Sequence, residues 1–205
     1  MKNLFFATIT IILLSTTYTQ AQDDSHGHEL NLGIGILSTA NLTFGFADMF
    51  VQSISQTVGE EVVFSKKTAS PVFHVNYKYW FGTHLALGAT LAAGTDNSDF
   101  TQKTHNGVVI DTGEMNRFIA TLAPEITFNY LNLRRFKLYG LAGIGCSYYK
   151  IDVNYDKADD KSSDRFLFDF QLTPIGLKFG NHFGGFAEAG FGYKGIIGIG
   201  LFAKW

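Results

Sequence analysis

The chain of 205 residues is poor in cysteine, in proline and in long apolar runs. Its single cysteine, Cys146, cannot form an internal disulfide, so no disulfide framework holds this fold together. Only three prolines interrupt it, which leaves long stretches free to form regular structure. After residue 14 no apolar run reaches the ~18 residues of a membrane-spanning helix, which excludes transmembrane helices in the rest of the chain.

A strong charge of either sign is also missing. There are 16 basic and 18 acidic residues, for a net charge of −2, so nothing in the electrostatics favours a nucleic acid as partner. No Gly-Lys-Ser/Thr phosphate loop occurs. His26 and His28 have a spacing found in metal sites but lack further ligands nearby, and the only hint of a catalytic pair is Ser70 close to His74. We therefore expect no catalytic, cofactor-binding or metal-binding residues and no enzymatic activity.

The N-terminus is typical of an exported bacterial protein. A short basic region precedes an apolar run over residues 4–14, and Thr19-Gln20-Ala21 places small residues at the −3 and −1 positions of a cleavage site. We expect a signal peptide over residues 1–21, an N-terminal segment over 22–28 and one domain over 29–205. No cysteine lies near the expected cleavage site, so we expect no lipid anchor.

Glycine, aromatic residues and strict alternation are abundant. Eight segments alternate apolar with polar or small residues, as half-buried strands do. The last of them runs to an aromatic residue, Trp205, in the manner of the final strand of bacterial outer-membrane barrels. The expected strands are residues 29–36, 73–80, 85–94, 117–128, 136–149, 166–173, 186–193 and 197–205.

The connections between these segments differ in length. Those at residues 80–84, 130–135 and 180–184 are short, whereas 38–70, 95–115 and 150–164 are long, polar loops. Short turns at one rim and long loops at the other indicate an eight-stranded, antiparallel, up-and-down transmembrane β-barrel. In the first long loop, apolar residues recur every four positions and predict a short helix: Phe46, Phe50, Ile54 and Val58. The alternative is an extra hairpin there, which would make ten strands.

Two further patterns concern the barrel wall. Pro124 and Pro174 fall inside strands, where each removes a backbone donor, so we expect a bulge at both. A bulge at Pro174 would turn Ile175, Leu177 and Phe179 toward lipid. Aromatic residues gather near both expected rims, as two membrane-interface belts would: Tyr77, Tyr79, Trp80, Phe128, Tyr130, Phe136, Tyr139, Phe183 and Trp205 near one, and Phe118, Tyr148, Tyr149, Phe166, Phe168 and Tyr193 near the other.

Four motifs carry a resemblance to a known family: Ala123-Pro-Glu-Ile-Thr-Phe-Asn-Tyr130, Tyr139-Gly-Leu-Ala-Gly-Ile-Gly145, Thr173-Pro-Ile-Gly-Leu-Lys-Phe-Gly180 and Glu188-Ala-Gly-Phe-Gly-Tyr-Lys-Gly195. They resemble small outer-membrane β-barrel proteins of the OmpA/OmpX-like superfamily, and most of all the Bacteroidota-type members. The resemblance implies a barrel in the outer membrane of a Gram-negative cell. It places no catalytic residue on this chain.

Charged residues on inward-facing positions are the candidate site. An eight-stranded barrel has room inside for side chains alone, so charges there must pair. We expect a Lys78–Glu125–Glu188 cluster and an Arg117–Asp169 pair.

Three functional hypotheses follow from this barrel. The leading one is a monomeric, non-enzymatic structural or surface-interaction protein whose partners are outer-membrane lipid and, during insertion, the barrel-assembly machinery. A narrow, porin-like channel and a lipid-modifying enzyme are the alternatives.

Overall fold

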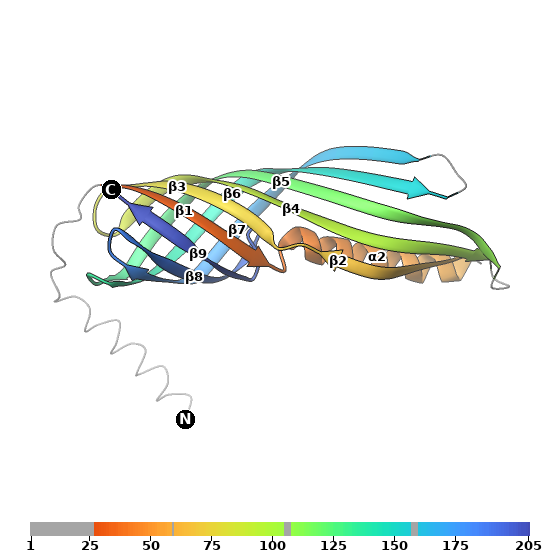
Figure 1. The fold of residues 1–205 in the computed structure, drawn as a ribbon, viewed down its shortest axis with the longest axis horizontal. Helices are drawn as coiled ribbons and strands as arrows, with labels where there is room; N and C mark the ends of the chain where they lie inside the picture. Colours follow the sequence, from red (N-terminus) through yellow and green to blue (C-terminus); the bar gives the residue numbers. More distant parts are fainter. Residues whose placement is uncertain (1–26, 59, 105–107, 157–159) are drawn as a thin grey trace, which may run out of the picture.

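The computed structural model describes residues 27–58, 60–104, 108–156 and 160–205 (Figure 1). The expected signal peptide, His26 and most of the expected N-terminal segment lie outside these residues.

Eight of the strands close into a ring. Each pairs antiparallel with the next ring strand along the chain, and the first pairs with the last, so the ring has no open edge in the barrel wall. This confirms the eight-stranded, antiparallel, up-and-down barrel. The ring strands are β1 (Gly27–Ile36), β3 (Val72–Trp80), β4 (Leu85–Thr104), β5 (Val109–Asn132), β6 (Phe136–Tyr155), β7 (Lys161–Gly180), β8 (Phe183–Gly192) and β9 (Ile197–Lys204).

The first strand begins earlier than the sequence indicates. Gly27 and His28 belong to β1 and not to a separate N-terminal segment. The backbone of His28 exchanges two hydrogen bonds with that of Trp205, at 2.8 and 3.0 Å, and their rings stack with centroids 6.1 Å apart. The two chain ends of the barrel are therefore joined at one rim.

The outside of the ring is a continuous apolar surface. Within the ring, exposed and buried residues alternate along the strands with period two outside the bulges, so that outward residues are exposed and inward residues are buried. A soluble barrel would reverse this polarity, because it would place the large aliphatic side chains inside. The exposed outward residues include Leu32, Ile34, Phe73, Val75, Leu87, Leu91, Leu122, Ile126, Ile144, Leu172, Ile197, Ile199 and Leu201.

The inside is filled by polar and aromatic side chains. Trp80, Tyr139 and Tyr193, which the sequence placed in the aromatic belts, are 1–3% exposed and point into the bore. A cavity of about 10 Å³ lies beside Asp169 and Tyr193, which is about the volume that one water needs.

Half of the strands continue far beyond the ring. β1, β3, β8 and β9 have 8–10 residues, close to the 9–11 that span a bilayer, whereas β4 to β7 have 20–24. The segments 95–115 and 150–164 are therefore mostly strand, and the expectation of long polar loops there is wrong. On β4 the polar residues Asp96 and Ser98 are the buried ones, so hydropathy gave no strand signal.

The predicted helix in residues 38–70 is confirmed. It is α2 (Thr39–Val58), and Ser38 caps it, because the Asn41 backbone N–H donates to the Ser38 hydroxyl. β2 (Glu60–Ala69) follows and pairs with the outer half of β4, outside the ring (Figure 1). The sheet thus holds nine strands over the described residues, and the alternative of a ten-stranded barrel is wrong. No helix in the described ranges combines the length and apolarity that a bilayer crossing demands.

The two prolines behave differently. Around Pro174 the register of β7 shifts by one against both β6 and β8, and Ile175 and Phe179 point outward while Lys178 points inward, as a bulge requires. At Pro124 the register of β5 with β6 is unchanged, so the expected bulge there is wrong.

Closure of the ring by β1 and β9 can be tested by cross-linking. In a Cys146→Ser background, cysteines at Leu32 and Leu201 should form a disulfide under mild oxidation in membranes, because the two residues are direct cross-strand partners. The control pair, Leu32 with Ile197, is displaced by four residues, roughly 13 Å along the strand, and should not cross-link. Equal cross-linking of both pairs would contradict the register.

Candidate functional site

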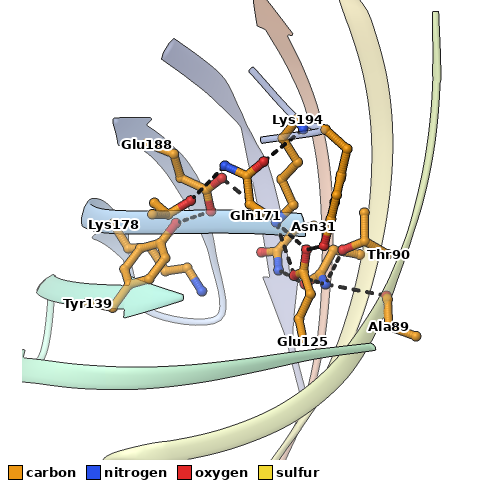
Figure 2. Close-up of polar contacts among 12 residues, drawn as sticks. Asn31, Ala89, Thr90, Glu125, Tyr139, Gln171, Lys178, Glu188 and Lys194 are labelled. Atoms are coloured by element: carbon orange, nitrogen blue, oxygen red, sulfur yellow. Dashed lines mark hydrogen bonds and ion pairs between the residues drawn. The ribbon is translucent and has the colours of Figure 1, made fainter. Parts of the chain in front are cut away.

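Three carboxylates and three ammonium groups form a buried network inside the barrel. Their side chains come from β1, β3, β5, β7, β8 and the β8–β9 turn, and each residue is at most 8% exposed. We call this set, with the two asparagines that join it, the bore network: Glu29, Asn31, Asn76, Lys78, Glu125, Lys178, Glu188 and Lys194. Figure 2 shows how most of these side chains converge.

The tight turn between β8 and β9 places Lys194, the cation at the centre of the bore network, inside the barrel. Gly192 and Gly195 have φ of +146° and +115°, a region that favours glycine, and the Gly195 N–H donates to the Gly192 carbonyl. This turn folds inward over the bore. Lys194 therefore lies inside, held by a 2.9 Å hydrogen bond from its backbone N–H to the Gln171 side chain.

Lys194 joins two carboxylates at the centre of the network. Its ammonium group lies 2.9 Å from Glu125 and 3.9 Å from Glu188. The Tyr193 hydroxyl donates to Glu125 at 2.6 Å, and the Tyr139 hydroxyl donates to Glu188 at 2.7 Å. Both buried carboxylates are thus paired and hydrogen-bonded, as a low-dielectric site requires.

A second ion pair lies nearer the rim that holds the chain ends. The Lys178 ammonium group binds Glu29, and the Trp80 indole N–H donates to the same carboxylate at 3.1 Å. Lys178 also lies 4.9 Å from the centroid of the Tyr139 ring, a cation–π distance. Lys78 is opposite Glu29 in the β1–β3 ladder and 5.3 Å from the same ring.

The two asparagines connect the two ion-pair groups. The Asn31 amide donates to Glu29 at 3.0 Å and to Asn76 at 2.9 Å. Asn76 in turn donates to Glu125 at 2.7 Å and to Thr90 at 2.7 Å. A chain of hydrogen bonds therefore runs along the bore between the two ion-pair groups.

The five charged residues singled out from the sequence are all buried, but their partners differ from those expected. Glu125 and Glu188 come together as predicted, yet the cation between them is Lys194 and not Lys78. Lys78 points into the bore one layer closer to the chain ends, because its cross-strand neighbour is Glu29.

The expected Arg117–Asp169 pair is replaced by two separate contacts. Arg117 forms a bidentate ion pair with Asp48 of α2, with one N–O distance of 3.2 Å, and lies 3.9 Å from Asp96 of β4. Asp169 accepts hydrogen bonds from the hydroxyls of Ser147, at 2.9 Å, and Thr39, at 3.1 Å. The helix supplies the partner, and its position could not be read from strand alternation.

Three charged residues of the network were missed. Glu29 could have been identified from the sequence, because it alternates with Leu30 in the first expected strand and so faces inward. Lys178 turns inward because of the bulge at Pro174, and the change of face that predicts outward Ile175 and Phe179 equally predicts an inward Lys178. Lys194 lies in a turn, where alternation predicts nothing.

The other residues considered for catalysis or metal binding do not come together in a site within the described ranges. The Ser70 hydroxyl is 3.0 Å from the Thr95 carbonyl, whereas His74 is buried in the bore with its ring 6.2 Å from that of Phe186. Within the described ranges no group of three or more His, Cys, Asp or Glu side chains is arranged to hold a metal ion. The arrangement acts as a charge-paired filling of the barrel.

Comparison with known proteins gives structural similarities only. No protein-family profile and no curated protein matches the chain. The chain is similar to the N-terminal β-barrel domain of Pseudomonas aeruginosa OprF, at 12% identity and a TM-score of 0.41, over 90% of this chain and 100% of that one. It is also similar to Ail of Yersinia pestis, solved in complex with the heparin analogue sucrose octasulfate, at 13% identity and a TM-score of 0.40, over 88% and 98%. The ring of strand pairs defines the architecture independently of these similarities.

Removing Lys194 should destabilise the barrel strongly. Lys194→Met leaves Glu125 and Glu188 without their cation, and breaking a buried ion pair in this way costs about 3–5 kcal/mol. The control is Lys150→Met, since Lys150 is 48% exposed and pairs with Asp152 at the surface, where such pairs contribute roughly 0–1 kcal/mol. Urea unfolding of both variants in detergent or lipid measures the difference. Equal stabilities would contradict the central role of Lys194.

Proposed function

We propose that this protein is an integral β-barrel of the cell outer membrane, non-enzymatic and monomeric, with a structural or surface-interaction role. Its ring spans the bilayer, its filled bore is a rigid plug, and its long strands project outside the cell. The single observation that carries the proposal is the continuous exposed apolar surface around the ring.

Several dimensions support a location in lipid. The short ring strands match the length that crosses a bilayer, and exposed aromatic residues lie near both rims, as interface belts do. Near the chain ends these include Phe81, Phe128, Tyr130, Phe183 and Trp205, and near the opposite rim they include Phe118, Phe170 and Phe191.

The state of the bore favours a plug over a channel. Ions cross a barrel through a hydrated lumen, whereas here paired charges and the rings of Trp80, Tyr139 and Tyr193 occupy the interior. A wall built around a rigid core suits a protein that presents a surface. The projecting part of β4 to β7, backed in part by α2, is that surface (Figure 1).

The rest of the proposal rests on sequence patterns. The signal peptide over residues 1–21 would deliver the chain for export, and the terminal strand with Trp205 would be the segment that the barrel-assembly machinery recognises. The four quoted motifs favour an OmpA-like barrel of the Bacteroidota type.

A charge on the apolar outer surface of the ring should destabilise the protein in lipid. Leu122→Arg places a cation on the outer face in the cross-strand row that runs from Leu122 through Leu91 and Val75 to Leu32, and the expected loss is about 2–4 kcal/mol. The control is Val109→Arg at the far end of the same strand, where the exposed apolar residue lies beyond the ring and the change should stay within ~0.5 kcal/mol. Urea unfolding in phospholipid vesicles, followed by heat-modifiable gel migration, measures both. Equal effects at the two positions would overturn the membrane assignment.

The plug should not conduct ions. In planar bilayers the purified protein should give no current steps, and Glu125→Ala should leave the trace unchanged, because Tyr193 and Asn76 still fill the bore beside it. An open porin measured in the same bilayers is the positive control. Stepwise currents that change on Glu125→Ala would instead support the channel hypothesis.

A further inference from the structure

A groove of about 700 Å³ lies where the β6–β7 hairpin leaves the ring. One side is the inner face of the hairpin, and the other is the first turn of α2, at Thr39 and Thr43. In the hairpin register, Tyr149 is opposite Arg165, Ile151 opposite Ser163 and Val153 opposite Lys161, so these six side chains share the face that lines the groove. A volume of this size accommodates a ligand of several hundred daltons.

The lining joins an apolar floor to a cationic border. Ile151, Val153 and Leu167 form the floor, and Leu167 is 50% exposed. Arg165 and Lys161 form the border. Both are exposed, and in the described part of the chain Arg165 has no carboxylate partner. An exposed arginine beside an apolar groove is arranged for an amphiphile with an anionic group.

Asp152 and Asp169 do not compete for these cations. Asp152 alternates with the floor residues and so belongs to the opposite face, where it accepts hydrogen bonds from Lys150, at 3.1 Å, and Ser162, at 2.6 Å. The carboxylate that does line the groove, Asp169, is buried and already accepts hydrogen bonds from the hydroxyls of Thr39 and Ser147. The groove therefore keeps a positive border.

The groove opens sideways onto the apolar outer surface of the ring. The β7–β8 ladder ends at Gln171 and Gly192, and the Phe170 carbonyl still accepts the Tyr193 N–H at 3.2 Å, so it is only beyond Phe170 that β7 has no ring neighbour on that side. The groove is bordered there by Phe168, Phe170 and Phe191, which are 74%, 41% and 44% exposed. A hydrocarbon chain could enter from the surrounding leaflet along this aromatic edge without crossing water.

We propose that this groove binds one acyl chain of an anionic membrane lipid, with the chain against Ile151, Val153 and Leu167 and the phosphate of the headgroup at Arg165 and Lys161. The inference rests on the proposed membrane location. It assigns the hairpin a ligand, where the proposed function assigns only a position outside the cell.

The test uses the full chain in nanodiscs that contain equal amounts of phosphatidylcholine and phosphatidylglycerol. Native mass spectrometry of the released protein should show phosphatidylglycerol retained in preference to phosphatidylcholine. Arg165→Gln and Lys161→Gln should each lower that preference about fivefold, since one cation near a membrane surface contributes about that factor. Lys150→Gln is the matched control: it removes the same charge from the opposite face of the same hairpin and should retain the preference.

A second variant tests the acyl chain separately from the charge. Leu167→Asn keeps both cations but makes the floor polar, and it should reduce retention of phosphatidylglycerol. If Leu167→Asn binds as the unaltered protein does, the anion alone is recognised and the acyl part of the proposal is wrong.

Other outcomes overturn the inference and remain distinguishable from failure of the membrane assignment. Equal retention of the two lipids, or a dimer mass in place of a lipid adduct, would refute the lipid groove in a protein that inserts and shows heat-modifiable migration. A protein that fails to insert into nanodiscs would refute the proposed function, and the groove proposal with it.

Discussion

The ion pairs in the bore are the constraint on which the rest of the structure depends. A barrel with a lipid-facing outside has its polar side chains on the inside, and eight strands leave too little space to hydrate them. Each buried charge must therefore meet an opposite charge within the wall. The Lys194 and Lys178 pairs meet this requirement with carboxylates from β1, β5 and β8. Because Lys194 joins the β8–β9 turn to β5 and Lys178 joins β7 to β1, the network links the wall across its interior.

Local irregularities in the wall serve this network. The bulge at Pro174 reverses the faces of β7, so that Lys178 points inward while Phe179 faces outward. The positive φ angles of Gly192 and Gly195 fold the last turn into the mouth and bring Tyr193 and Lys194 to Glu125. A regular eight-stranded wall without these two features would leave Glu29 without Lys178 and Glu125 without Lys194.

The sequence predicts a strand where large apolar side chains occupy every second position. Strands such as β1 and β3 have this pattern, so the sequence predicts both their position and which residues face outward. The helix is predicted by its four-residue apolar repeat. The outer half of β4 was not readable, because the side buried there carries Asp96 and Ser98. The partner of Arg117 was not readable either, since Asp48 reaches it from a helix whose packing direction strand alternation does not encode.

The projecting part has two regions that are braced to different degrees. The β4–β5 hairpin is flanked by β2, and α2 is tied to β5 by the Asp48–Arg117 pair, so this region is braced on one face. The β6–β7 hairpin has its outer strand β7 unpaired beyond Gln171, and all residues from Lys161 to Phe168 are exposed. Exposed aliphatic and aromatic side chains that remain beyond the apolar outer surface of the ring need a partner if they are not to face water. The braced region therefore supports the sheet, and the hairpin beside it is where a ligand from the membrane surface would bind.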